Sequence, residues 1–225
     1  MGKALLSPSF TFSMERGHPA SAGACVLDFA PVGTSQQAFI LLNIIPRDQH
    51  CISRKNISDG ALRVMSRLRS SGYQAYLVGG AVRDLLLGGH PKDFDIATDA
   101  TPEAVTDLFR NSRIIGRRFR IVHVRFGREI IEVTTFRGHH ENGSSSGEHP
   151  ETGGNHSRQS ASGLLLRDNV YGTLEEDAAR RDLTVNALYY DAGKFEVFDH
   201  VHGLQDLENR SVCIIGDPEQ RYTED

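Results

Sequence analysis

Two adjacent glycines between an apolar segment and an amphipathic one are the feature that most limits how this chain can fold. Residues 73–78 are apolar enough to form a buried strand, and residues 81–87 have the spacing of a helix that Gly88 ends. Gly79 and Gly80 allow the tight backbone turn that this junction needs. Because the first amides of a helix are free to donate, the segment predicts a phosphate-binding turn, with Arg83 one turn into the helix.

Two aspartates follow this turn at a spacing that puts both carboxylates on one face of a strand. Asp93 and Asp95 are two residues apart, while Phe94 and Ile96 are expected to point into the core. Two carboxylates on one face repel each other unless a cation lies between them, and Mg²⁺ is the usual cation in phosphoryl chemistry. The pair therefore predicts a magnesium site. Taken alone, an Asp-x-Asp pair is more often simply solvated.

Together, the two segments resemble a known family. Gly79-Gly80-Ala81-Val82-Arg83-Asp84 and Asp93-Phe94-Asp95 are similar to the head domain of the class II nucleotidyltransferases, the superfamily of bacterial poly(A) polymerases and CCA-adding enzymes. The resemblance begins near residue 46. It implies an α/β (α+β) fold, with a mixed, mostly antiparallel sheet backed by helices. It also implies attack of an RNA 3′-hydroxyl on the α-phosphorus of ATP, with two Mg²⁺ ions placed by Asp93 and Asp95.

A second segment supports the same resemblance. Residues 180–187 are similar to the family's Arg-Arg-Asp-x-x-x-Asn-Ala signature. They fall in a helical pattern over residues 174–188 that is interrupted near Arg181, and on a helix Asp182 and Asn186 would share a face. Arginine bonds two phosphate oxygens at once, and an asparagine side chain both donates and accepts. Asp182 either orders the arginines or takes part in catalysis. Alternatively, residues 174–188 are a surface helix held by salt bridges, with no role in binding or catalysis.

The resemblance also assigns roles to single residues. Relatives recruit a further carboxylate from a neighbouring strand, and Glu132 matches it, although an exposed strand glutamate is the simpler reading. The implied catalytic residues are Asp93, Asp95, Glu132 and Asp182. The implied nucleotide-binding residues are Gly79, Gly80, Arg83, Arg180, Arg181 and Asn186.

Residues 114–124 indicate a subgroup. Their sequence, Ile-Ile-Gly-Arg-Arg-Phe-Arg-Ile-Val-His-Val, resembles the segment that marks bacterial poly(A) polymerases. The expected reaction is therefore template-independent addition of AMP from ATP to RNA 3′ ends. A CCA-adding or A-adding tRNA nucleotidyltransferase shares every catalytic residue and stays open as an alternative. A non-catalytic nucleotide- or RNA-binding module is a second, which the intact aspartate pair argues against.

The pattern along the chain divides it into a leader and one domain. Residues 1–45 show no sustained period and do not match the family, so a disordered leader is expected there, followed by the catalytic head at residues 46–225. Residues 138–163 are rich in Gly, Ser and His and predict a long mobile loop. Helices are expected at residues 57–71 and 101–110, strands at 114–115, 119–126 and 129–136, and a hairpin at 189–201. In relatives the last residues lead into a helical neck and body, so we expect a head without these parts.

Charge points to a local rather than a global nucleic-acid surface. The formal net charge is −4, so any RNA contact must come from one basic region. Residues 110–128 contain no acidic residue and seven arginines, namely Arg110, Arg113, Arg117, Arg118, Arg120, Arg125 and Arg128. Their partner is expected to be RNA or ATP, with an exposed basic hairpin that binds neither as the alternative.

Cysteine and apolar content indicate a cytoplasmic protein without a membrane span. Cys25, Cys51 and Cys213 lack Cys-x-x-Cys spacing, which fits a reducing compartment and argues against a disulfide framework or a zinc site. The longest apolar run, residues 38–45, is far shorter than the ~20 residues that a membrane span needs. The sequence gives no indication of the oligomeric state.

Overall fold

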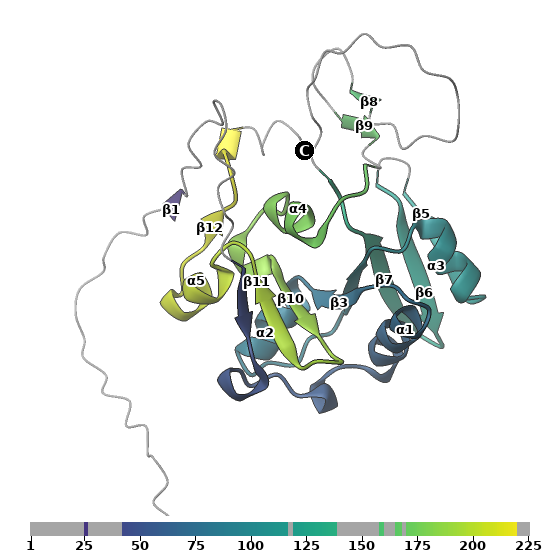
Figure 1. Cartoon of the computed structure of the whole chain (residues 1–225), viewed down its shortest axis with the longest axis horizontal. Coiled ribbons are helices and arrows are strands. Elements are labelled where there is room, and N and C mark those ends of the chain that lie inside the picture. The colour runs from purple at the N-terminus through teal and green to yellow at the C-terminus, as the bar shows by residue number, and fades with distance from the viewer. Residues whose placement is uncertain are drawn as a thin grey trace, which may run out of the picture.

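An eight-stranded mixed sheet organises the protein (Figure 1). The computed structural model describes residues 42–116, 119–138 and 170–219, together with the backbone of three short strands at 25–26, 158–159 and 165–167. The strand order is β2-β11-β10-β3-β4-β7-β6-β5. Their bounds are β2 Asn43–Ile45, β3 Ala75–Val78, β4 Asp95–Thr98, β5 Ser112–Ile115, β6 Ile121–Phe126, β7 Glu129–Thr135, β10 Leu188–Asp191 and β11 Glu196–Asp199.

The pairing confirms the predicted fold class. Neighbouring strands are antiparallel throughout, except that β4 runs parallel to β7. The chain makes that crossover through α3 and the strands β5 and β6. Two strand pairs lie outside this sheet: β1 (Cys25–Val26) with β12 (Cys213–Ile214), and β8 (Arg158–Gln159) with β9 (Leu165–Arg167).

Helices cover the two faces of the sheet unequally. The core on one face joins Val64 of α1 and Val82 of α2 to strand residues such as Leu77. On the other face, Leu174 of α4 packs with Val78. The helices are α1 Asp59–Ser70, α2 Gly80–Leu86, α3 Pro102–Leu108, α4 Leu174–Ala179 and α5 Gly203–Asn209, with 3₁₀ turns η1 Arg47–Gln49, η2 Arg54–Asn56 and η3 Thr184–Asn186. We call the side that carries α4 the open face, because only this short helix packs on it among the described helices (Figure 1).

Local sequence explains where the helices begin. Ser58 caps α1 by accepting a hydrogen bond from the amide of Ala61, and Thr101 caps α3 in the same way, followed by Pro102 as predicted. Before α2, Gly79 has φ 76° and ψ −147°, a conformation that essentially only glycine adopts. The glycine turn predicted between strand and helix is therefore present.

The interruption predicted near Arg181 in the helical pattern over residues 174–188 is present, but the helix expected after the interruption is not. α4 ends at Ala179, and the chain continues as a bend and the 3₁₀ turn η3. At the break, the Asp182 carboxylate accepts a hydrogen bond from the amide of Leu183, and the Asp182 carbonyl accepts one from Ile215. Such local side-chain bonds compete with helical ones, which explains the break.

The structure corrects the expected boundary of the leader and describes little of the expected loop. β2 lies within the expected leader, residues 1–45, but pairs with β11 at the edge of the sheet, where Ile45 is buried. The predicted loop at residues 138–163 lies almost entirely outside the described residues, as do Arg117 and Arg118. No helix in the described ranges has the length and apolar character needed to cross a membrane.

Candidate active site

Four polar residues from four strands form one row across the open face. Asp95 on β4 pairs with Glu132 on β7, Glu132 with His123 on β6, and His123 with Arg113 on β5. Directly paired residues project from the same face of a sheet. His123 Nε2 lies 3.1 Å from Glu132 Oε1. The strand pairing therefore places Glu132 beside Asp95, as the resemblance implied.

Negative charge accumulates around Asp95. Burial raises the pKa of the Asp95 carboxyl above its ordinary value, and the charge of Glu132 raises it further. Arg181 lowers the pKa of Asp95, and Asp93 makes a smaller contribution that raises it. Asp93 is not on the strand as predicted, since β4 begins at Asp95 and Asp93 is an exposed residue of the preceding loop.

These carboxylates fit a divalent cation in chemistry and charge. Burial is the larger cause of the raised pKa of Asp95, and the repulsion from Glu132 and Asp93 that adds to it is what a bound cation would relieve. Within the described residues, no group of three or more His, Cys, Asp or Glu side chains is gathered closely enough to hold a metal. Mg²⁺ is usually bound by one or two carboxylates completed by substrate phosphates and water, so a pair of aspartates suits it.

The glycine turn lies against this acidic group. A methyl group added at Gly79 would come 3.7 Å from Asp95 Oδ2, so the turn and the carboxylate are neighbours. One added at Gly80 would come 3.3 Å from the Arg83 guanidinium, which folds back over the turn. The sequence elements predicted to cradle phosphate and to bind metal are therefore adjacent in space.

Arg83 joins the glycine turn to the second motif. Its Nε donates to Asp84 Oδ1 at 2.9 Å, and its Nη1 donates to Asn186 Oδ1 at 2.9 Å. The break after α4 brings Asn186, in η3, to this position. Asp182 does not share a helix face with Asn186 as predicted. It is exposed and bonds to the following amide.

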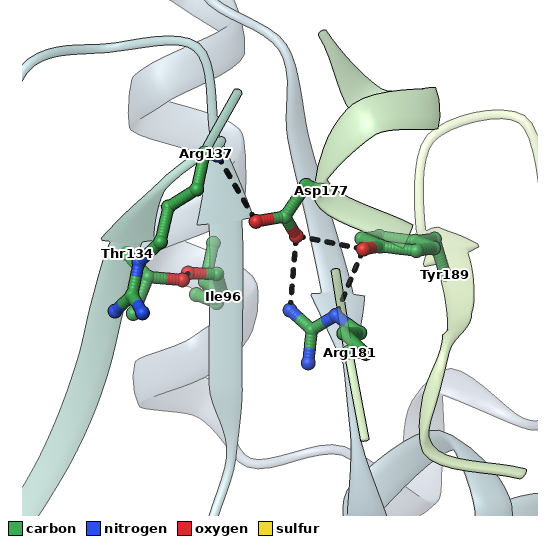
Figure 2. A network of polar contacts seen from close by, with 6 residues as sticks. All are labelled: Ile96, Thr134, Arg137, Asp177, Arg181 and Tyr189. Atoms are coloured by element: carbon green, nitrogen blue, oxygen red, sulfur yellow. Dashed lines mark hydrogen bonds and ion pairs between the residues drawn. The ribbon is translucent and has the colours of Figure 1, made fainter. Parts of the chain in front are cut away.

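Arg181 belongs to a buried polar network (Figure 2). Its Nη2 donates to Asp177 Oδ2 at 3.1 Å and its Nε to the Tyr189 hydroxyl at 2.8 Å, while that hydroxyl donates to Asp177 Oδ2 at 2.7 Å. The other Asp177 oxygen accepts the backbone amide of Arg137 at 3.1 Å. Burial raises the pKa of the Tyr189 phenol well above its ordinary value. Asp177 is thus fully partnered, and Arg181 is held in one orientation.

An arginine-lined cavity opens beside this network. It has a volume of about 220 Å³, and its walls are Thr134, Arg137, Asp177, Arg180 and Arg181. Arg180 donates from Nη1 to the carbonyl of Gly138 at 2.7 Å. Thr134 follows Glu132 by two residues along β7, so the cavity adjoins Glu132 and Asp95 on the same face.

The sequence indicated Arg180 and Arg181 but not the other three residues of this cavity, Thr134, Arg137 and Asp177. Asp177 precedes Arg181 by four residues, a spacing typical of helical ion pairs, and this signal was available. Arg137 follows the end of β7 and carried no comparable signal. Within the arginine-rich stretch, Arg120 is ion-paired with Glu103, and Arg117 and Arg118 lie outside the described residues.

Comparison with known proteins gives relatives of two kinds. The chain is 58% identical over 184 residues to poly(A) polymerase I of Salmonella typhimurium, which covers 82% of this chain and 38% of that protein. It is 39% identical over 165 residues to the CCA-adding enzyme of Bacillus pumilus, covering 73% and 37%. The chain thus spans about two fifths of the length of these curated relatives.

A solved structure and a family model agree with these relatives. The crystal structure of the Bacillus stearothermophilus CCA-adding enzyme in complex with CTP superposes with a TM-score of 0.56 at 34% identity, covering 74% of this chain and 35% of that one. The model of the poly A polymerase head domain matches residues 75–213, which contain every site residue described above. Because this match extends over more than half of the sequence, the chain belongs to the poly A polymerase head domain family.

Proposed function

We propose that this chain is the catalytic head of an enzyme that adds AMP from ATP to RNA 3′ ends without a template. The observation that carries the proposal is the pairing of Asp95 with Glu132 next to a cavity with three arginines in its walls. Negative groups can place metal ions, and positive groups can bind a triphosphate. Nucleotidyl transfer requires both, side by side.

The nucleotide is proposed to bind between the glycine turn and the arginine-lined cavity. Arg180 and Arg181 would hold triphosphate oxygens, because a guanidinium forms two parallel bonds to phosphate. Gly79 and Gly80 would let the backbone approach the phosphates closely. Arg83 would act with Asn186, whose side-chain NH₂ would donate to sugar or base.

Asp93 and Asp95 are the proposed ligands of Mg²⁺. When bound, two such ions would lower the pKa of the attacking 3′-hydroxyl and neutralise the leaving pyrophosphate. Glu132 would complete the acidic group from the neighbouring strand, with its carboxylate oriented by His123. For Asp182, the hydrogen bond to Leu183 supports an organising role at the break that brings Asn186 to Arg83.

The relatives favour poly(A) synthesis over CCA addition. Identity is 57–58% to poly(A) polymerase I proteins of Salmonella typhimurium and Escherichia coli but 39% to the CCA-adding enzyme of Bacillus pumilus. We therefore propose RNA 3′ ends and ATP as the substrates. A cytoplasmic location is proposed as well, in keeping with the free thiol of Cys51.

A nucleotide-preference assay tests this function. The full-length protein is incubated with Mg²⁺, a labelled oligo(A) primer or a tRNA that lacks its CCA end, and either ATP or CTP. We expect repeated AMP addition to the oligo(A) primer and little CMP addition to either RNA. Efficient CMP addition to the tRNA would favour the CCA-adding alternative, and nucleotide binding without incorporation would favour a non-catalytic module.

A further inference from the structure

A second hollow lies on the open face, at the Arg113 end of the row that begins at Asp95. It has a volume of about 520 Å³ and is formed where β5 meets β6 and the turn before β7. Arg113, His123 and Arg125 contribute its basic and polar groups, and Ile115 and Ile130 contribute apolar surface. We call it the β5–β6 cleft.

The cleft has positive charge without an internal counterion. Its walls contain no Asp or Glu among the described residues. Arg113 and Arg125 are exposed, and within the described ranges neither guanidinium forms an ion pair or a side-chain hydrogen bond. Arg120, from the same arginine-rich stretch, is by contrast paired with Glu103. In a chain with a net charge of −4, two unpaired arginines in one hollow favour an anionic ligand.

The cleft also presents exposed apolar side chains at two opposite corners, Ile115 on β5 and Ile130 on β7. Ile115 is 41% exposed and Ile130 is 40% exposed. A free phosphate or a triphosphate tail would leave these side chains in water. A nucleic-acid strand would cover them with its sugars and bases while its phosphates meet the arginines.

The strand register gives the position of the cleft relative to the reaction centre. Arg113 lies three strands from Asp95 in the same cross-strand row, through His123 and Glu132. Strands are spaced by about 4.8 Å, so the separation is about 14 Å. This distance suits a position slightly upstream in the primer.

From these observations we propose that the β5–β6 cleft binds the RNA primer just upstream of its 3′ end. Arg113 and Arg125 contact backbone phosphates, and Ile115 and Ile130 support the sugars or bases between them. The row from Arg113 to Asp95 then guides the 3′-hydroxyl toward the carboxylates. This inference rests on the proposed function, because it assigns a place to the primer of that same reaction.

Primer binding across a salt series tests the cleft. Anisotropy of a 5′-labelled oligo(A) is measured without nucleotide for the full-length parent and for Arg113→Ala/Arg125→Ala. Each phosphate contact to a single strand contributes about 0.7 to the slope of log affinity against log salt, so the double variant should lose about 1.4. Arg113→Lys/Arg125→Lys keeps both charges and should therefore keep most of the slope. That result would exclude a folding defect caused by substitution at these two positions.

The matched control removes two arginines from the other side of the sheet. Arg63 and Arg67 are exposed on α1, and Arg63→Ala/Arg67→Ala changes the net charge equally. This control should leave the slope at the parent value. The affinity for a non-hydrolysable ATP analogue should be unchanged in both double variants.

The outcomes separate the inference from the proposed function. If the parent adds AMP but the salt slope of Arg113→Ala/Arg125→Ala equals that of the parent, the cleft does not bind the primer. The proposed function then still stands. A loss of ATP-analogue affinity at an unchanged slope overturns the primer site in favour of a triphosphate site. A reduced slope in a protein that adds no nucleotide supports RNA binding here and contradicts the proposed activity.

Discussion

Arg83 donates a hydrogen bond of 2.9 Å to the side-chain oxygen of Asn186, from a position 103 residues earlier in the chain. Arg83 belongs to the helix that follows the glycine turn, and Asn186 to the 3₁₀ turn that follows the break after α4. This bond joins the two motifs that the resemblance treats separately. The two motifs are therefore one structural unit, and a substitution in either motif should alter the contribution of the other to nucleotide binding.

A double-mutant cycle on this pair should show coupling in nucleotide binding. Arg83→Ala should weaken binding of an ATP analogue, and Asn186→Ala should weaken it less, because Asn186 acts partly by orienting the arginine. The coupling energy should be about 1 kcal/mol, within the range for residues in direct contact. Arg83→Lys should restore affinity only in part, since an ammonium cannot form two coplanar bonds. Strictly additive effects would show that the bond has no role in binding.

Removing either aspartate of the proposed metal pair should abolish AMP incorporation. Asp93→Ala and Asp95→Ala each remove electrostatic stabilisation of the transition state, so activity should fall at least ~10²-fold in primer-extension assays. Circular dichroism should show an intact fold. Asp107→Ala, which removes an exposed carboxylate from α3, is the control and should retain activity. Near-normal activity in either test variant would exclude the metal assignment.

The sequence predicts local features of this site well and long-range ones poorly. Glu132 could be placed beside Asp95 because strand alternation sets the face of each residue and the motif sets the strand. The interruption near Arg181 was predicted, but the 3₁₀ turn that replaces the helix after it was not, because residues 182–188 keep helical spacing. The contact of Arg83 with Asn186 depends on that break and on the pairing of β10 with β3, which no local pattern specifies.

Tyr189 and Tyr190 offer a matched test of the buried network. The Tyr189 hydroxyl bonds both Asp177 and Arg181, whereas the Tyr190 hydroxyl is buried without a hydrogen-bond partner among the described residues. Tyr189→Phe should therefore lower the free energy of unfolding by about 1–3 kcal/mol, the usual cost of leaving buried polar groups unpaired. Tyr190→Phe should be neutral or stabilising, because it removes an unsatisfied hydroxyl. Urea denaturation measures both, and equal effects would contradict the network's role.

The two neighbouring arginines of the cavity should differ in their effect on folding. Arg181→Ala leaves the buried Asp177 carboxylate without its ion-pair partner, so it should reduce both stability and ATP affinity. Arg180→Ala should reduce ATP affinity with a smaller loss of stability, and neither should weaken RNA binding as much as nucleotide binding. Thermal denaturation beside ATP-analogue and oligo(A) binding distinguishes these effects. Unchanged ATP affinity in both variants would make the two arginines purely structural.

His200 should make the stability of the protein depend on pH. Its ring is buried, and neither nitrogen has a hydrogen-bond partner among the described residues. Burial lowers the pKa of His200 below its ordinary value, although the charges of Glu175 and Asp199 oppose the shift. Below a pH of about 6.5 the unfolded chain therefore binds a proton that the folded chain does not, so the free energy of unfolding falls as the pH decreases.

The contribution of His200 can be isolated by comparing slopes. Between pH 7.5 and 5.5, the free energy of unfolding from urea denaturation should fall more steeply for the parent than for His200→Gln. One proton can contribute at most about 1.4 kcal/mol per pH unit to this difference. His90 is exposed, so His90→Gln serves as the control and should follow the parent. Parallel curves for the parent and His200→Gln would mean that His200 takes up its proton equally in the folded and unfolded states.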